Sequence, residues 1–165
     1  MSERHVCTNS DFLWREIGGL PVAVKYIAPY PHIIVNHAMV VYGNGGIFHH
    51  ECFAGNKVIE SIEIASDIAY KVRFLHNNAI TGFMNATNLV RVIGLPSAYY
   101  NSAFLGCSKL EYVMFIQLPC LDVTGAFEGC SNLKYVVDLD RRSGGYSSLI
   151  ASLPRDTKVI TTFER

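Results

Sequence analysis

The sequence lacks an excess of either charge and a long uninterrupted apolar run. Its 165 residues carry 14 Lys and Arg against 14 Asp and Glu. No global field therefore favours nucleic acid or an anionic membrane. The most apolar stretch, residues 21–42, is broken by two prolines, a lysine and two histidines, so it does not predict a membrane span. We expect neither nucleic acid nor membrane as a partner.

An apolar run of the signal-peptide type is also missing near the amino terminus. This predicts a cytoplasmic or virion-associated protein rather than a secreted one. The five cysteines are odd in number and form no CxxC pair, so neither a disulfide framework nor a zinc knuckle is predicted. GxSxG, HExxH, P-loop and dinucleotide-binding motifs are absent from the sequence. We therefore predict a protein that is not an enzyme, with no catalytic residue, no metal and no cofactor.

What the sequence does have is an internal repeat in a chain that is half apolar. Residues 103–113 read AFLGCSKLEYV and residues 126–136 read AFEGCSNLKYV, and most of their positions are identical. The spacing of Phe104, Leu110 and Val113 recurs in two weaker copies that begin at Phe53 and Phe83. Such units cannot bury their apolar faces singly, but stacked neighbours make a continuous core.

These AFxGCSxLxxV units resemble BspA-type leucine-rich repeats, a family of protein-recognition and adhesion repeats that also occurs in phage-encoded proteins. The resemblance implies an α/β fold: a short leucine-rich-repeat solenoid with parallel strands on the concave face and short helical or 3₁₀ turns opposite. We place the repeats at residues 47–140. Residues 1–46 are then an N-terminal cap or docking segment, and residues 141–165 a C-terminal cap.

The two ends carry their own signals. Ser10 or Asp11 predicts the start of a short helix that ends at Gly18 and Gly19. Strands are expected at residues 22–27 and 33–42, followed by a tight turn at residues 43–46. Near the C-terminus we expect a short helix over residues 149–153 and a last strand at residues 158–163.

Alternation along each repeat strand predicts which side chains face outward. If Ile62, Val92, Val113 and Val136 point inward, their neighbours form two columns on the concave face. One column contains Ser61, Arg91, Tyr112 and Tyr135, and the other contains Glu63, Ile93, Met114 and Val137. Because Tyr, Met and Arg are enriched in protein interfaces, we predict a protein-binding site. Its residues are Glu63, Arg91, Tyr112, Met114, Tyr135 and Val137.

The function expected from this surface is a non-enzymatic protein-binding or assembly module, with carbohydrate as another ligand that tyrosines could hold. A phage virion component, structural or used in host adsorption, stays an alternative. A homo-oligomer or a larger assembly is left open. A further alternative is a metalloprotein or enzyme that uses His49, His50, Glu51 and Cys52, although adjacent strand residues point to opposite faces and rarely bind one ion. The repeated Cys107 and Cys130 are expected to be small buried residues at the corners of the repeats.

Overall fold

The computed structural model describes residues 3–36, 47–49, 51–65, 73–75, 82–95, 102–116, 125–138, 153–154 and 156–161. These residues are mostly strands, and the only helix among them is a 3₁₀ turn, η1, at Asn9–Asp11. A large parallel sheet with almost no helix makes the architecture α/β-like. The expected helical turns are, in the described units, single turns closed by hydrogen bonds between residues three apart, as from the Cys107 amide to the Phe104 carbonyl.

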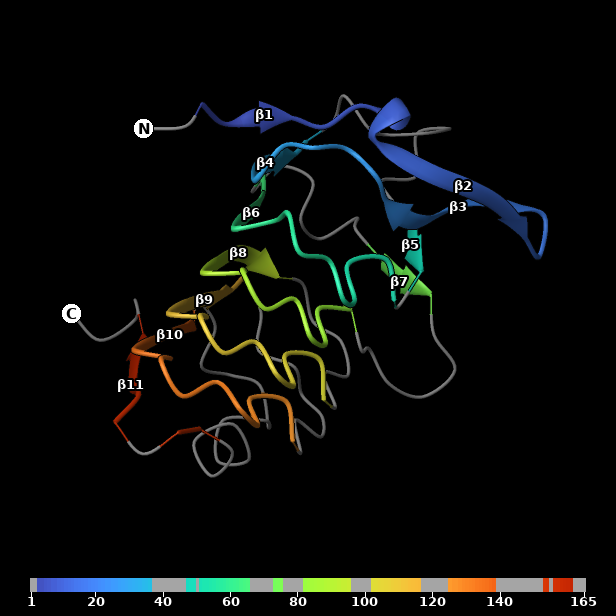
Figure 1. Ribbon diagram of the computed structural model, residues 1–165. Helices are drawn as coiled ribbons and strands as arrows, with labels where there is room; N and C mark the ends of the chain where they lie inside the picture. Colours follow the sequence, from blue (N-terminus) through green and yellow to red (C-terminus); the bar gives the residue numbers. More distant parts are fainter. Residues whose placement is uncertain are drawn as a thin grey trace.

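The larger sheet has seven strands, and all of its pairs are parallel (Figure 1). Across the sheet, the strands are β1 (His5–Val6), β4 (His32–Val35), β6 (Ser61–Ile64), β8 (Arg91–Leu95), β9 (Tyr112–Phe115), β10 (Tyr135–Asp138) and β11 (Lys158–Thr161). The N-terminal, central and C-terminal segments all contribute strands, so hydrogen bonding is continuous across their expected boundaries.

A smaller sheet lies apart from this one. It contains β2 (Phe12–Ile17), β3 (Leu20–Tyr26), β5 (Ile47–His49) and β7 (Arg73–Leu75), in that order. The antiparallel hairpin β2–β3 extends away from the larger sheet (Figure 1). Residues 73–75 thus pair with β5, while β6 pairs directly with β8. The step of 30 residues from Phe53 to Phe83, longer than the later steps of 21 and 23 residues between the phenylalanines, therefore places no strand between β6 and β8.

Four phenylalanines form a stack through the core, which confirms the predicted equivalence of their positions. The ring of Phe53 lies parallel to that of Phe83 at 5.4 Å, Phe83 to Phe104 at 5.1 Å, and Phe104 to Phe127 at 5.3 Å. All four side chains are at most 3% exposed. Offset parallel rings at this spacing are a favourable aromatic geometry. The stack therefore joins neighbouring repeat units along the whole described series.

Backbone hydrogen bonds tie the same corners together. The Phe83 amide donates to the Ala103 carbonyl at 3.0 Å, and the Phe104 amide to the Ala126 carbonyl at 2.8 Å. Two residues after each of these phenylalanines the chain takes a left-handed conformation, with φ of +60° at Asn85 and +79° at Gly106. Glycine and asparagine tolerate this conformation better than other residues. The repeated Gly after Phe thus suits the left-handed conformation of the corner, which Asn85 also adopts.

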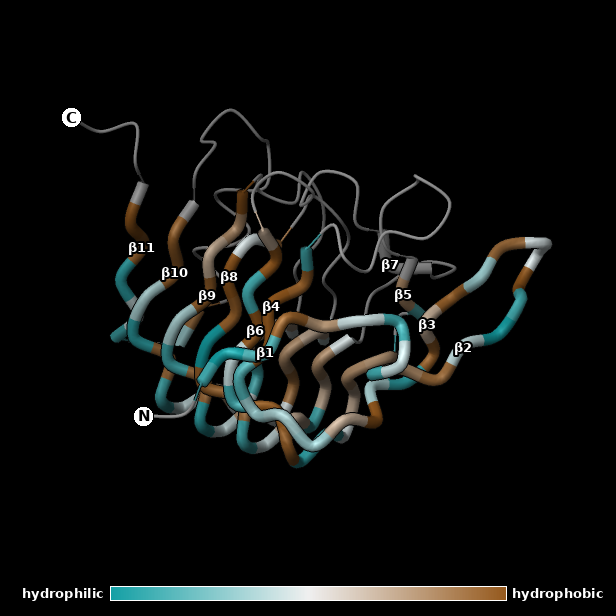
Figure 2. Tube along the Cα trace, turned by 90° about the horizontal axis from the view of Figure 1, so that it is seen from above, coloured by the Kyte–Doolittle hydropathy of each residue, from teal (hydrophilic) through white to brown (hydrophobic). Residues whose placement is uncertain are grey.

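The strands that follow the corners lie in register. Ile62, Val92, Val113 and Val136 occupy equivalent positions and are at most 2% exposed, as predicted. Figure 2 shows β8, β9, β10 and β11 running side by side. β-Branched residues at these positions suit a pleated surface packed on one side. These four positions thus form one column of β-branched side chains that lines the interior of the stack.

The predicted N-terminal helix is wrong. Residues 12–17 form strand β2, and Gly18 and Gly19, both at positive φ, make the two-residue turn to β3. Such a turn matches the twist of a hairpin. Phe12 points inward and its ring lies 5.3 Å from that of Tyr26 and 6.0 Å from that of Phe53. Burial against these rings overrides the helical spacing of the apolar residues.

The other expected end elements are confirmed in part. β3 corresponds to the strand expected at residues 22–27, β4 to the start of the one expected at residues 33–42, and β11 to the last strand. Residues 37–42 and 162–163 lie outside the described residues. The turn at residues 43–46 lies outside the described residues, as does the C-terminal helix except for Leu153. β1 was not expected: the Cys7 amide donates to the Ile34 carbonyl at 2.8 Å, beside β4.

Candidate binding surface on the parallel sheet

Parallel register lines up the outward side chains of the larger sheet in two rows. The first outer row consists of His32, Ser61, Arg91, Tyr112, Tyr135 and Lys158. The second outer row consists of Ile34, Glu63, Ile93, Met114, Val137 and Ile160. Neighbouring strands lie about 4.8 Å apart. Side chains distant in the sequence thus become adjacent on one surface.

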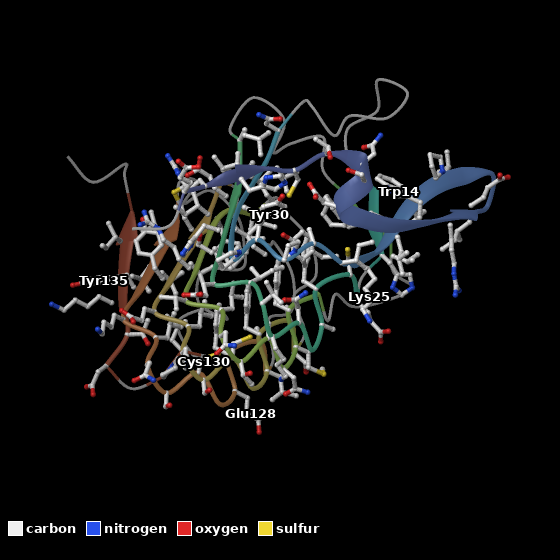
Figure 3. All side chains as sticks on the ribbon, turned by 45° about the horizontal axis from the view of Figure 1, so that its top comes forward. Trp14, Lys25, Tyr30, Glu128, Cys130 and Tyr135 are labelled. Atoms are coloured by element: carbon white, nitrogen blue, oxygen red, sulfur yellow. The ribbon has the colours of Figure 1, made fainter. Side chains whose placement is uncertain are left out.

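The six predicted site residues fall on these rows. Arg91, Tyr112 and Tyr135 are consecutive members of the first outer row, and Tyr135 is 40% exposed. Glu63 and Met114, in the second, are partly buried. In Figure 3, Tyr135 lies on the far side of the molecule from the hairpin residues Trp14 and Lys25. The surface therefore stands clear of the β2–β3 hairpin.

Val137 corrects the prediction. Its side chain is only 6% exposed, so it offers little contact area to a partner. The residues beside it in register are Met114 and Ile160. Both have longer side chains than valine, and strands about 4.8 Å apart bring them against it. Val137 therefore adds little exposed surface to the second outer row.

The first outer row contains a cation–π contact. The guanidinium carbon of Arg91 lies 5.0 Å from the ring centroid of Tyr112. At this distance the face of the ring attracts the cation and orients it. Arg91 itself is exposed. The contact thus holds an arginine and a tyrosine together at the surface without burying the charge.

Two ion pairs lie next to the rows. Arg4 Nη1 is 3.0 Å from Glu63 Oε1, and Lys134 Nζ is 3.2 Å from Glu111 Oε1. At the other end of the first outer row, His32 Nδ1 lies 2.8 Å from Ser61 Oγ. A hollow of about 120 Å³ opens beside Arg91 and is lined by Arg4, Ile33, Ser61, Ile62, Glu63, Arg91 and Ile93.

Sequence reasoning missed the ends of the rows. Lys158 and Ile160 of β11 are exposed, Ile160 by 43%. The signal was present in the repeat, because the sequence offset that relates Tyr112 to Tyr135 also relates Tyr135 to Lys158. His32 and Ile34 had no comparable signal, since β4 carries none of the repeat motif.

The repeated cysteines are structural, as predicted. Cys107 Sγ donates to the Phe83 carbonyl at 3.0 Å, and Cys130 Sγ to the Phe104 carbonyl at 3.1 Å. Both side chains are at most 1% exposed, and Figure 3 shows Cys130 among the turns opposite the sheet. Burial raises the pKa of each thiol from 9.0 to about 12. A protonated, enclosed thiol is a poor nucleophile.

These thiols predict an alkaline loss of stability. Above pH 9 a cysteine ionises in the unfolded chain but stays protonated in the folded one, up to about pH 12. The free energy of unfolding therefore falls as pH rises through this window, by about 1.4 kcal/mol per pH unit for each such thiol. We expect urea unfolding at pH 8 and pH 10 to show a larger loss for the wild type than for the variant Cys107→Ala/Cys130→Ala. Ala86 fills the equivalent position of an earlier unit. Equal losses in the two proteins would contradict this assignment.

The candidate metal-binding segment is dispersed. His49 is partly buried in β5, its Nδ1 accepting the Glu51 amide at 3.2 Å, while Glu51 is exposed and Cys52 is 2% exposed. Burial raises the pKa of the Cys52 thiol. His50 lies outside the described residues. Within the part of the chain that the structure describes, no three His, Cys, Asp or Glu residues are grouped to hold a metal ion.

No helix in the described part of the chain is both long and apolar enough to cross a membrane. Comparison of the chain with protein-family models, curated proteins and solved structures found no match.

Proposed function

We propose that this protein is a non-enzymatic binding or assembly module, built as a short leucine-rich-repeat solenoid that presents the first outer row to a protein partner. The repeat architecture is supported by the stack of Phe53, Phe83, Phe104 and Phe127 and by the parallel, in-register strands that follow these corners. Stacked repeats produce extended surfaces of this kind.

The observation that carries the proposal is the adjacency of Arg91, Tyr112 and Tyr135. The sequence places them in three successive repeat units, and parallel pairing brings them onto neighbouring strands. Tyrosine and arginine provide large contact areas with polar ends, and they are enriched among residues that dominate binding energy. Met114 adds an adaptable apolar contact beside them.

A non-catalytic role fits the chemistry of the site. Apart from the hydrogen-bonded pair His32 and Ser61, the outer rows hold tyrosine, aliphatic, methionine and charged side chains, whereas the thiols of Cys107 and Cys130 are buried behind the sheet and bonded to carbonyls. Tyrosine faces also stack on sugar rings, so carbohydrate is a second ligand class to compare with protein in binding assays.

We predict that Tyr112→Ala and Tyr135→Ala each weaken partner binding by roughly tenfold, the effect of losing an interface anchor worth about 1–3 kcal/mol. The partner is to be identified by photo-crosslinking from position 135, and the dissociation constants measured by calorimetry with the purified partner. Circular dichroism and urea unfolding establish that each variant is folded.

Tyr30→Ala is the matched control. Tyr30 is 42% exposed, much like Tyr135, but its ring stacks on His5 at 3.6 Å and it lies before β4, outside the outer rows. This variant is expected to bind as the wild type does. Unchanged affinity in both row variants, or an equal loss in Tyr30→Ala, would remove the proposed surface.

A further inference from the structure

Positive charge stands at both ends of the tyrosine pair. Arg91 precedes Tyr112 in the first outer row, and Lys158 follows Tyr135. We call these four residues, Arg91, Tyr112, Tyr135 and Lys158, the cation–tyrosine row. Arg91 lies three strands from Lys158, which is about 14 Å at the spacing of a sheet. The row is thus a linear pattern of charge, two aromatic rings and charge.

The two cations differ from the other basic residues nearby. Arg4 pairs with Glu63 and Lys134 pairs with Glu111. Within the described part of the chain, no carboxylate forms an ion pair with Arg91 or Lys158. Both are exposed. Their charges are therefore available to a partner, while Glu63 and Glu111 beside the row are already paired with Arg4 and Lys134.

A hollow in the surface beside Arg91 leaves room for a side chain of a partner. The hollow of about 120 Å³ beside Arg91 includes Ser61 and Arg4 in its lining. Its one carboxylate, that of Glu63, is paired with Arg4 at 3.0 Å. A carboxylate entering this hollow would meet the Arg91 guanidinium, which the ring of Tyr112 already orients at 5.0 Å. Such pre-orientation reduces the entropy lost on binding.

We infer that the partner presents an extended acidic peptide segment that crosses the strands along the cation–tyrosine row. Two carboxylates separated by about 14 Å, the width of three strand spacings, would meet Arg91 and Lys158, with aromatic or apolar residues between them on Tyr112 and Tyr135. An extended chain rises about 3.3 Å per residue, so the carboxylates belong at positions i and i+4. This inference rests on the proposed function and specifies the chemistry of its partner.

A protein partner is favoured over a nucleic acid. Phosphate-binding surfaces gain most of their affinity from an accumulation of positive charge. Here the formal net charge is zero, and the cation–tyrosine row has a cation only at each end. Two isolated cations separated by aromatic rings match two isolated carboxylates better than a continuous phosphate chain.

The test uses a defined peptide, acetyl-Glu-Pro-Trp-Pro-Glu-amide, whose prolines favour an extended chain. Its binding to the full chain is followed by the NMR shifts of the residue 112 and 135 amides and compared with that of the same peptide with Gln in place of Glu. We expect about fivefold tighter binding of the acidic peptide at low salt, a difference that shrinks as salt screens the exposed charges.

Variants assign the effect to the two cations. Arg91→Gln and Lys158→Gln are each expected to halve the logarithm of the affinity ratio between the acidic peptide and its Gln counterpart. Arg15→Gln is the control, because Arg15 is an exposed arginine of the hairpin strand β2 and should leave the preference unchanged.

The outcomes separate the inference from the proposed function. Equal binding of the two peptides at Tyr112 and Tyr135 overturns the acidic preference but leaves the binding surface intact. A preference that persists in Arg91→Gln and Lys158→Gln also overturns it, as does tighter binding of an oligothymidylate at the row. If neither peptide shifts the tyrosine amides, the binding surface itself is contradicted.

Discussion

Replacing Phe104 with alanine is expected to lower the free energy of unfolding by about 3–5 kcal/mol. The Phe104 ring is fully buried and lies between two parallel rings, those of Phe83 and Phe127. Truncation removes both ring contacts and opens a cavity in the middle of the stack. Domains of this size are stable by only about 5–15 kcal/mol, so the variant should unfold at much lower urea.

Leu13→Ala provides the comparison. Leu13 is also an apolar residue, but it lies on the β2–β3 hairpin and is 48% exposed. Its loss should change stability by no more than about 0.5 kcal/mol. Both variants are measured by urea unfolding with circular dichroism. A cost for Phe104→Ala as small as that for Leu13→Ala would mean that the phenylalanine stack does not join the repeat units energetically.

Gly94→Ala is expected to cost about 3–5 kcal/mol, of which the backbone conformation accounts for only part and overlap with a neighbouring strand for the rest. Gly94 has φ of +92° and lies where the register between β8 and β9 shifts. A Cβ atom there would come within 2.3 Å of the Ile64 carbonyl oxygen. Because the obstacle is backbone of the adjacent strand β6, relief requires the two strands to separate.

The hairpin glycine Gly18 isolates the conformational part of this cost. Its φ is +60°, and a Cβ atom added there meets nothing within 4 Å. Gly18→Ala should therefore cost about 1–2 kcal/mol, the usual penalty for an L-residue in the left-handed region. Unfolding midpoints of the two variants give the difference. Equal costs would show that Gly94 is not a point of close strand approach.

The costs of Phe104→Ala and Gly94→Ala bear on the proposed function because the proposed binding surface depends on strand register. Gly94 follows Ile93 in β8, and the cation–tyrosine row crosses β8 at Arg91. A one-residue slip between strands would carry the outward side chains to the inner face. The buried corner and the close approach at Gly94 thus hold Arg91, Tyr112 and Tyr135 on one side of the sheet.

The repeat and the sides of its strands are predictable from the order of the residues alone. Near-identity of residues 103–113 and 126–136 predicted equivalent corners, and alternation about Val113 and Val136 predicted the outward tyrosines. Both inferences use short-range periodicity, which the chain carries in its own order. The buried cysteines followed from the same equivalence, because a residue repeated at a crowded corner must be small.

The way in which the non-repeating segments join the stack depends on long-range contacts. Residues 12–17 have an apolar spacing that fits a helix, yet pairing with β3 and contact with the Tyr26 and Phe53 rings make them a strand. Val137 is outward by alternation, yet it is only 6% exposed, beside Met114 and Ile160 in register. Both results arise from contacts between residues remote in the chain, and local periodicity contains no information about the size or identity of such neighbours.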